Sequence, residues 1–254
     1  MSFLRVIIPT YNGGERLPQM VESIRGQTMQ DYHLIIVDDM STDDTFKVVK
    51  KLKPDMALKM KYKGYAGGAR NEGMRHYTDD LYTYWCDDDD RLMDNQVFER
   101  IQKCAIENNY PDVIRLNYIK TTLSTGLPGN HHIRYREPIT VADIACDVSR
   151  GMPWSKVVKT EKCVEFPEDL IVDDCYQHIM QMDACDTAAV IHDDCYEWLV
   201  REGSLTTTHG TAMWLSGWYL EIAKLMRQRE NVIHNYTREA IDLRIEWIKR
   251  HIRL

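Results

Sequence analysis

Four consecutive aspartates, Asp87 to Asp90, follow a short aromatic run that ends at Cys86. Like charges about 4 Å apart repel by roughly 4 kcal/mol at an effective dielectric constant near 20, so a folded protein either turns such side chains into water or places a cation among them. Residues two apart on an extended chain share a face, which lets Asp87 and Asp89 point together while Asp88 points away. Two carboxylates with water and phosphate oxygens form a site typical of Mg²⁺ or Mn²⁺. The run therefore indicates a divalent-cation site, with a solvated acidic turn as the alternative.

A second set of candidate groups, Pro9-Thr10-Tyr11-Asn12, stands where the first expected strand ends. Tyr11 offers a flat aromatic ring, and Thr10 and Asn12 offer hydrogen-bonding groups, which together suit a base or a ribose. The sequence has neither the glycine spacing of a dinucleotide-binding turn after this strand nor a Walker A pattern. The alternative for this segment is an ordinary turn.

Charged residues also end the second expected strand and open the third expected helix. Asp39 can accept a hydrogen bond from a base N–H or a ribose hydroxyl, whereas Asp38 is assigned a structural role. The alternative for this pair is an N-cap of the following helix. Arg70 follows the glycine-rich turn 64–68, where its guanidinium can meet a phosphate or Asp87. The alternative for Arg70 is a solvated position on the helix face.

Short hydrophobic strands alternating with amphipathic helices must position these groups. We predict strands at 4–8, 34–37, 56–60, 81–86 and 113–118, with Pro9 ending the first, and helices near 15–26, 46–52, up to residue 74, and 94–108. This alternation predicts βαβ units and a mainly parallel sheet flanked by helices, the α/β class. Right-handed crossovers bring the strand-to-helix loops to the carboxyl edge, where open α/β sheets bind ligands. The loops expected there are 9–14, 38–44, 62–68 and 87–92.

Length and composition narrow the class of protein. The 254 residues are 44% hydrophobic and 28% charged, which supports a folded core, and the net charge of −7 argues against a general nucleic-acid binder. No run approaches the ~18 apolar residues of a membrane-spanning helix, and the N-terminus has no signal-peptide pattern. Seven cysteines without a CxxC pair are typical of reduced thiols. We therefore expect a cytoplasmic location.

Four segments in order resemble the nucleotide-sugar half of family 2 glycosyltransferases of the GT-A fold, namely Val6 to Asn12, Ile36 to Thr45, Ala69-Arg70-Asn71-x-Gly73 and Asp87-x-Asp89-Asp90. The match runs over residues 3–118. It implies a Rossmann-like GT-A sheet and a nucleoside-diphosphate sugar donor, with a UDP-sugar favoured. The donor contacts that it implies are Pro9, Thr10, Tyr11, Asn12, Asp39, Arg70 and Asp88. Asp87 and Asp89 then form the DxD pair that binds Mn²⁺ or Mg²⁺, and Asp88 stands where small residues are common in the family.

The second half resembles the acceptor side of bacterial polysaccharide-type members of the family. The matching segments are Pro153 to Lys156 and Phe166 to Asp174. In those members a Glu-Asp pair supplies the catalytic base, so Asp173 takes the Glu position and Asp174 aligns with the base. The alternative is a helix N-terminus enriched in acids. Arg201 lies in an aromatic–arginine–glycine–serine segment and is a candidate contact to the diphosphate.

The resemblance implies an inverting glycosyltransferase that acts on a glycan or lipid-linked acceptor in polysaccharide synthesis. We expect residues 1–118 to form the nucleotide-sugar-binding half, 119–210 the acceptor-binding half of the same domain, and 211–254 the C-terminal helices. Two other functions remain open, a sugar-phosphate nucleotidyltransferase and a non-catalytic sugar-binding protein. The nucleotidyltransferase would be expected to show a glycine-rich, basic first loop, and Pro9 to Gly14 is not basic.

The C-terminal segment 244–254 is basic and amphipathic. Such a helix can lie on an anionic membrane, which would suit a lipid-linked acceptor and a location at the inner face of the membrane. The alternative is that its apolar side docks on the protein itself.

Overall fold

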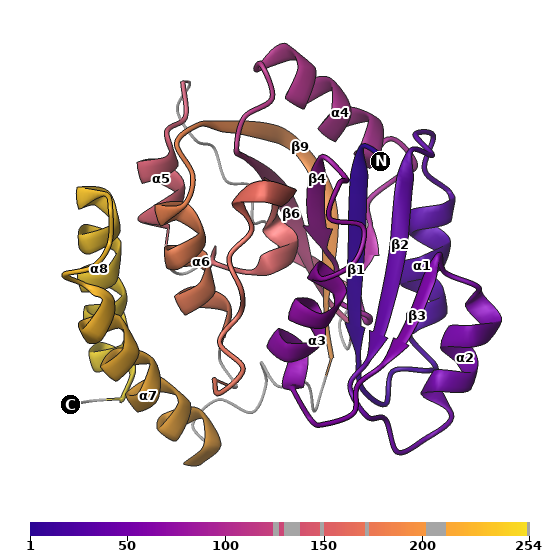
Figure 1. The fold of residues 1–254 in the computed structure, drawn as a ribbon, viewed down its shortest axis with the longest axis horizontal. Coiled ribbons are helices and arrows are strands. Elements are labelled where there is room, and N and C mark those ends of the chain that lie inside the picture. The colour runs from indigo at the N-terminus through magenta and orange to yellow at the C-terminus, as the bar shows by residue number, and fades with distance from the viewer. Residues whose placement is uncertain (124–126, 130–137, 148–149, 171–172, 202–211, 253–254) are drawn as a thin grey trace.

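The computed structural model describes all residues except 124–126, 130–137, 148–149, 171–172, 202–211 and 253–254. The described residues form one mixed β-sheet of nine strands with helices on both faces, and two long C-terminal helices lie at one side of the molecule (Figure 1). The predicted α/β class, with a sheet flanked by helices and a helical C-terminal region, is confirmed.

The first four major strands are parallel, in the order β3-β2-β1-β4. They are β1 (Leu4–Thr10), β2 (Tyr32–Asp38), β3 (Met56–Lys59) and β4 (Tyr82–Trp85). The prediction that Pro9 ends the first strand is wrong, because Pro9 lies inside β1 opposite Val37. The register between β1 and β4 stops at Ile7, so the missing N–H of Pro9 costs no ladder hydrogen bond on that side.

Helices α1 (Leu17–Arg25), α2 (Thr45–Leu52), α3 (Tyr65–Met74) and α4 (Val97–Glu107) connect these strands or follow them. The segment 64–68 was expected to be a turn, but Gly67 and Gly68 lie inside α3. Close packing explains glycine in this helix. A Cβ atom on Gly73 would lie 2.6 Å from Cγ2 of Ile7, so α3 sits directly on β1.

The chain after β4 extends the same sheet in a mixed arrangement. Its strands are β5 (Arg91–Leu92), β6 (Val113–Thr122), β7 (Leu127–Gly129), β8 (Lys156–Lys159) and β9 (Ala188–Val200). β8 inserts antiparallel between β4 and β6, and β9 then pairs parallel to β6. The parallel arrangement predicted from βαβ units therefore holds for the first four major strands and is interrupted by β8. β6 also runs through the predicted boundary at residue 118.

Two apolar clusters fill the space on the two faces of the sheet. One packs α1 and α4 against side chains such as Val6 and Ile8 of β1. The other packs α3, α5 (Val141–Ala145) and α6 (Asp174–Asp183) against side chains such as Ile7 and Ile35. The alternation of neighbours along β1 between the two clusters follows from the period-two geometry of a strand buried on both faces.

Of the C-terminal helices α7 (Ala212–Gln228) and α8 (Asn235–Ile252), α8 packs on α5 and α6, and α7 packs on α8. Ile245 and Ile248 of α8 are buried, and Arg244 forms a buried double hydrogen bond with Glu221 of α7, at 2.8 and 3.0 Å. The apolar side of the described part of 244–254 therefore faces the protein. Among the described helices, none has the length and apolar character needed to cross a membrane.

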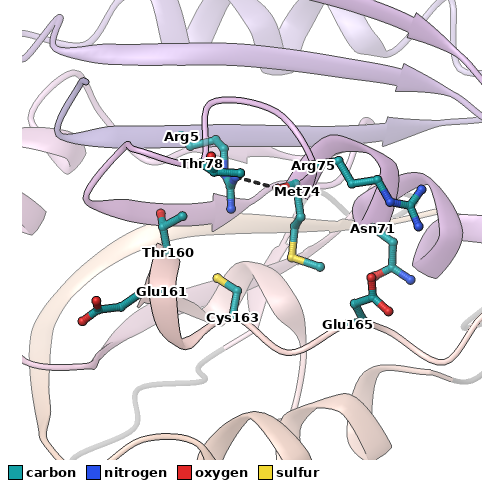
Figure 2. Close-up of a pocket in the computed structure, with 9 residues that line it drawn as sticks. All are labelled: Arg5, Asn71, Met74, Arg75, Thr78, Thr160, Glu161, Cys163 and Glu165. Atoms are coloured by element: carbon teal, nitrogen blue, oxygen red, sulfur yellow. Dashed lines mark hydrogen bonds between the residues drawn. The ribbon is translucent and has the colours of Figure 1, made fainter.

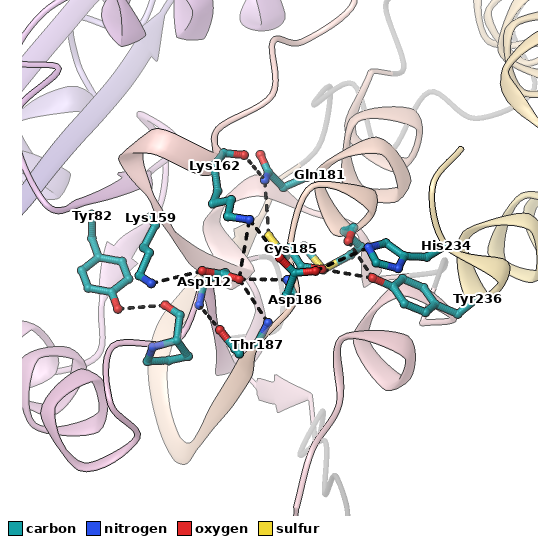
Figure 3. Close-up of polar contacts among 12 residues, drawn as sticks. Tyr82, Asp112, Lys159, Lys162, Gln181, Cys185, Asp186, Thr187, His234 and Tyr236 are labelled. Atoms are coloured by element: carbon teal, nitrogen blue, oxygen red, sulfur yellow. Dashed lines mark hydrogen bonds and ion pairs between the residues drawn. The ribbon is translucent and has the colours of Figure 1, made fainter. Parts of the chain in front are cut away.

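A polar network at the start of β6 ties these parts together (Figure 3). Asp112 accepts hydrogen bonds from the Lys159 ammonium at 3.1 Å and from the backbone N–H groups of Asp186 and Thr187 at 2.9 and 3.1 Å. The Tyr236 hydroxyl of α8 donates to the carbonyl of Cys185 at 3.1 Å. One carboxylate thus fixes the end of β8 and the turn between α6 and β9, and α8 docks on the same turn.

Candidate functional site

The loops that follow β1, β2 and β4 meet at the carboxyl edge of the sheet. The backbone N–H of Asp39 donates to the carbonyl of Thr10 at 2.9 Å, and that of Asn12 donates to Oγ of Ser41 at 2.9 Å. The Thr10 hydroxyl donates to the Asp88 carboxylate. Residues separated by as many as 78 positions are therefore in direct contact, as the topology of the predicted sheet required.

One side of this edge presents an aromatic ring beside a carboxylate. The Tyr11 side chain is 45% exposed, and Nζ of Lys63 lies 3.0 Å from its ring centroid. The same ammonium lies 2.8 Å from Oδ2 of Asp39, whose Oδ1 accepts from the Gly64 N–H at 2.8 Å. Asp38 instead accepts from the Ser41 N–H at 3.1 Å, a local structural contact. Sequence reasoning missed Lys63, for which its place in the polar loop after β3 was the sole signal.

The four aspartates turn in different directions. Asp88 points to Thr10, and Arg16 lies 3.8 Å from it. A Cβ atom on Gly13 would overlap the Asp88 carboxylate and the Thr10 hydroxyl, so a larger residue there would displace this contact. Asp89 accepts from Nε of Arg201 at 3.1 Å. Burial raises the pKa of Asp88 to about 7.

Asp90 is the most deeply placed acid of the run. Its Oδ1 accepts from the Leu199 N–H at 2.8 Å, and its Oδ2 is buried without a hydrogen-bond partner among the described residues. Burial, together with the charges of Asp87 and Asp89, raises its pKa well above the ordinary value. Asp90 therefore supports the loop through its hydrogen bond to Leu199, and its burial favours the protonated form.

Arg70 connects the acid run to the second half of the chain. Its side chain is 3% exposed, and Nη2 donates to Oδ1 of Asp87 at 2.8 Å. Nη1 donates to Oδ1 of Asp174 at 3.3 Å and lies 3.6 Å from Oδ2 of Asp173. Burial raises the pKa of Asp87 to about 6, although Arg70 opposes that shift. One guanidinium therefore holds together the predicted metal ligand and the predicted base pair.

Asp173 and Asp174 occupy the start of α6, with Asp173 at the N-cap position. Asp173 is 4% exposed, and a Cβ atom on Gly67 would lie 2.6 Å from its Oδ2, so α3 and α6 approach closely at this point. Burial and the neighbouring charge of Asp174 raise the pKa of Asp173 well above the ordinary value. The side chain of Asp174 is 37% exposed, which makes it the accessible member of the pair.

Two aromatic residues support the acid run from behind. The Tyr196 hydroxyl of β9 accepts a hydrogen bond from the backbone N–H of Asp87 at 3.0 Å. Its ring stacks on Trp154, with centroids 4.5 Å apart and planes inclined by 5°. Neither residue was assigned a role from the sequence. The signals there were the place of Trp154 in the segment Pro153 to Lys156 and of Tyr196 among the aromatic residues that precede Arg201.

The donor set of the site fits a divalent cation that is shared with a phosphate. Asp87 and Asp89 each use one carboxylate oxygen for an arginine. Within the described residues, no group of three or more His, Cys, Asp or Glu side chains is arranged to hold a metal ion by itself. Mg²⁺ is commonly held by one or two carboxylates with substrate phosphates and water, and this site offers such a pair.

A pocket of about 300 Å³ lies at the far end of α3 from the acid run (Figure 2). Arg5 lines it, but its guanidinium already donates to the carbonyls of Met74 and His76, which end α3, at 2.8 and 2.7 Å. Asn71 also lines the pocket while holding the backbone of Phe166 with two hydrogen bonds. The contacts of both side chains are those of a structural joint, so we place the functional site at the carboxyl edge.

An α/β sheet with acids, arginines and an exposed aromatic ring at its carboxyl edge is the arrangement expected of a transferase with the GT-A fold. Residues 5–152 match the sequence model described as Glycosyl transferase family 2. Because this match covers more than half of the chain, the chain belongs to the family 2 glycosyltransferases.

The relatives are bacterial glycosyltransferases. The poly(ribitol-phosphate) beta-N-acetylglucosaminyltransferase TarP of Staphylococcus aureus is 37% identical over 115 residues, which are 43% of this chain and 35% of TarP. The UDP-Glc:alpha-D-GlcNAc-diphosphoundecaprenol beta-1,3-glucosyltransferase WfaP of Escherichia coli is 29% identical over 154 residues, 58% of this chain and 59% of WfaP. The match thus spans between a third and three fifths of these relatives.

A solved structure confirms the fold at full coverage. Staphylococcus aureus TarS 1–349 in complex with UDP-GlcNAc superposes with a TM-score of 0.77 at 19% sequence identity, covering 100% of this chain and 73% of that one. This likeness establishes the GT-A fold of the chain.

Proposed function

We propose that this glycosyltransferase moves a sugar from a nucleoside-diphosphate donor, with UDP-sugars favoured, to a hydroxyl of a glycan or lipid-linked acceptor, and that it inverts the anomeric configuration. The observation that carries the proposal is the set of ion pairs around Arg70, which joins Asp87 of the acid run to Asp174 of α6. Asp87 and Asp174 are 17 and 104 positions away from Arg70 in the sequence, and both contact its guanidinium. On this proposal, Asp87 acts on the leaving group and Asp174 removes the proton, and the two steps take place side by side.

The nucleotide half of the donor fits the edge formed by β1 and β2. Tyr11 supplies an exposed ring for the base, and the buried carboxylate of Asp39 supplies an acceptor for a base N–H or a ribose hydroxyl. Thr10 and Asn12 order the two loops, and Pro9 holds the end of β1 on β2. TarS was solved with UDP-GlcNAc, and the name of WfaP specifies UDP-glucose and a diphosphoundecaprenol-linked acceptor, which supports these substrate classes.

Mn²⁺ or Mg²⁺ is the proposed cofactor, with Asp87 and Asp89 as its protein ligands. A cation held there would supply Lewis-acid stabilisation of the departing diphosphate. Arg70 and Arg201, which pair with these acids in the absence of substrate, would turn toward the diphosphate oxygens and stabilise their charge electrostatically. Asp88 closes the loop through Thr10 and thereby fixes the direction of both ligands.

Asp174 is the proposed general base. Its carboxylate is accessible and lies on the same guanidinium as Asp87, so an acceptor hydroxyl that reaches it also faces the donor phosphates. It removes the hydroxyl proton as the oxygen attacks the anomeric carbon, and this single displacement inverts the configuration. Asp173 is buried beside Asp174, and burial raises its pKa, so we assign it the role of orienting Asp174.

Two other functions predict different chemistry at the same edge. A sugar-phosphate nucleotidyltransferase would release pyrophosphate from a nucleoside triphosphate, whereas the first loop offers no basic cradle for a triphosphate. A non-catalytic sugar-binding protein would leave the four contacting groups Arg70, Asp87, Asp173 and Asp174 without use. The burial of Arg70 among three acids favours catalysis over that reading.

A cytoplasmic location, at the inner face of the membrane when the acceptor is lipid-linked, accompanies the proposal. Since Ile245 and Ile248 pack inward, membrane contact through 244–254 would rest on the exposed charges of Lys249 and Arg250. Such contact is electrostatic and is expected to weaken with salt. Binding to anionic vesicles at low and high salt, with and without residues 249–254, tests it.

The function is tested by a donor screen. Purified protein is mixed with UDP-, GDP- or dTDP-sugars, Mn²⁺ or Mg²⁺, and a lipid-linked or glycan acceptor, and the released nucleoside diphosphate is measured. We expect release from a UDP-sugar that requires the cation and is lost in Asp89→Asn. Asp193→Asn, a change at an exposed aspartate of β9, is the matched control and keeps wild-type rates. Pyrophosphate release from UTP and a sugar phosphate instead would establish the nucleotidyltransferase.

A further inference from the structure

The segment Arg150–Lys156 touches both halves of the site without carrying any of the groups proposed for chemistry. Its described residues are 150–156, which include the short 3-10 helix Pro153–Ser155 and the first residue of β8. Two fully buried basic side chains hold it. Lys156 donates to the carbonyls of Gly151 and Met152 at 2.9 and 3.0 Å, and Arg115 of β6 donates to the carbonyl of Arg150 at 3.0 Å.

One end of the segment presses on the helix that carries the proposed base. A Cβ atom on Gly151 would lie 2.9 Å from Cβ of His178 and 3.2 Å from Cα of Cys175. Only glycine allows this approach without a shift of the backbone. Cys175 directly follows Asp174, so the position of Gly151 sets how far the first turn of α6 stands from the sheet.

The other end reaches the acid run. Trp154 stacks on Tyr196, and the Tyr196 hydroxyl accepts from the backbone N–H of Asp87. Through this pair of rings the segment supports the strand end from which Asp87 projects. Gly151 and Trp154 are three residues apart, so one short, rigid piece of chain contacts the supports of both Asp87 and Asp174.

We propose that Lys156 and Arg115 are positioning residues for the transfer reaction: by clamping the carbonyls of residues 150–152 they fix the separation between Asp87 and Asp174. Lys156 is buried against neutral carbonyls, and burial lowers its pKa to about 7, whereas Arg115 also has the Asp147 carboxylate 3.7 Å away. Burying Lys156 is an expensive way to close a loop, because a desolvated charge costs several kcal/mol. The arrangement is explained if the loop must not move. A displacement of about 1 Å between reacting groups can cost as much as 100-fold in rate.

This inference rests on the proposed function and is tested with the full chain. Lys156→Met removes the Lys156 contacts of the clamp, to the carbonyls of Gly151 and Met152, and Gly151→Ala pushes α6 outward while leaving the clamp in place. For both we expect kcat for transfer to fall about 10- to 100-fold, by misplacement of the base relative to the donor. Gly151→Ala does not touch the nucleotide contacts, so its affinity for UDP with Mn²⁺ stays within twofold of wild type by our expectation.

Lys159→Met is the matched control. Lys159 lies on the same strand and pairs with Asp112, so its loss lowers the melting temperature without moving Gly151 or Trp154. If kcat per folded molecule in the Lys156 or Gly151 variants is no lower than in Lys159→Met, the positioning role is refuted and the cations are structural. Should Lys156→Met not fold, Gly151→Ala and Tyr196→Phe decide the matter through a double-mutant cycle.

If one segment supports both Asp87 and Asp174, the losses of kcat in Gly151→Ala and Tyr196→Phe should not add up in the double variant. If the two supports are independent, the losses should be additive. Tyr196→Phe removes one hydroxyl and adds no atom, which keeps the packing on Trp154. Additivity with unchanged kcat in Gly151→Ala would overturn the inference. Failure of the wild-type protein to release a nucleoside diphosphate from any donor would instead overturn the proposed function, so the two failures are distinguishable.

Discussion

Asp112 and the edge acids Asp88, Asp90 and Asp173 are all buried, but the protein treats them in opposite ways. Asp112 accepts from two backbone N–H groups and from Lys159, with Lys162 at 4.0 Å (Figure 3). Burial alone would raise its pKa, but the hydrogen bonds outweigh burial and lower it. A carboxylate supplied with donors on several sides is a structural joint between β6, β8 and the turn before β9.

The acids at the edge receive fewer donors than their burial demands. The pKa of Asp87 is raised to about 6 and that of Asp88 to about 7, in each case mainly by burial. Asp90 and Asp173 each keep a buried oxygen without a hydrogen-bond partner among the described residues. Acids with so few donors are the ones that a bound cation or a substrate donor would satisfy, and this contrast with Asp112 supports the site proposed at the edge.

The largest predicted effect is a loss of activity when an acid of the carboxyl edge is changed, but not when Asp112 is changed. Asp174→Asn removes the proposed base and should lower kcat at least 100-fold, within the ordinary range for loss of a general base, with little change in melting temperature. Asp112→Asn removes a satisfied structural acid and should lower the melting temperature while kcat per folded molecule stays close to wild type. Initial rates of nucleoside-diphosphate release, together with thermal unfolding curves, measure both quantities.

The comparison breaks if the two variants exchange their behaviour. An Asp174→Asn protein with wild-type kcat would move the base to another residue. An Asp112→Asn protein that is folded but inactive would mean that the joint transmits its geometry to the site, since β8 links Lys159 to Lys156 over four residues.

The donor half of this comparison could be predicted from sequence because its signals are local. The strand Val6-Ile7-Ile8 and the acids that follow Cys86 lie in continuous segments, and parallel topology alone brings their ends together. The direct contacts of Thr10, Asp39 and Arg70 needed no information beyond that topology. The roles assigned to these residues stay predictions until they are tested by mutation.

The acceptor half could be predicted only in part, because its geometry depends on contacts between distant residues. β8 is four residues long, too short for a periodic signal, and nothing local tells that it enters antiparallel between β4 and β6. The glycines at 67 and 151 were read as turn material or not at all, although each permits a close approach to α6. The sequence suggested a phosphate or Asp87 as the partner of Arg70. Its contact with Asp174 was not predicted, because the two residues are 104 positions apart in the sequence.

A second prediction is that the stability contributed by Asp88 and by Asp112 changes with pH in opposite directions. The pKa of Asp88 is about 7 in the folded protein against an ordinary value of 3.8, so between these values the folded state binds more protons than the unfolded state. Stability from this group is therefore lost as pH rises from about 4 to about 7. Asp112 has a lowered pKa, so its contribution is present above the ordinary value and is lost as pH falls through the folded one.

Urea unfolding of wild type, Asp88→Asn and Asp112→Asn across this range measures both slopes. Relative to wild type, Asp88→Asn should gain stability as pH rises toward 8, and Asp112→Asn should be most destabilised near neutral pH and approach wild type in acid. Parallel curves for all three proteins would contradict the assignment of opposite protonation in the two regions.

The smallest predicted effect concerns Asp39, an edge acid that resembles Asp112 in being well supplied with donors. Lys63 and the Gly64 N–H both reach its carboxylate, and Lys63 also lies on the ring of Tyr11. Lys63→Met should weaken UDP binding only about two- to fivefold, because a half-exposed ion pair contributes at most ~1 kcal/mol. In this variant the side chains of Tyr11 and Asp39, which contact the base and the ribose, are no longer held in place by Lys63.

Isothermal titration with UDP and Mn²⁺ measures the change. Lys47→Met, which breaks an exposed ion pair on α2, is the control. Tighter binding in Lys63→Met would show that the ammonium occupies the place of the base and must leave when the nucleotide enters.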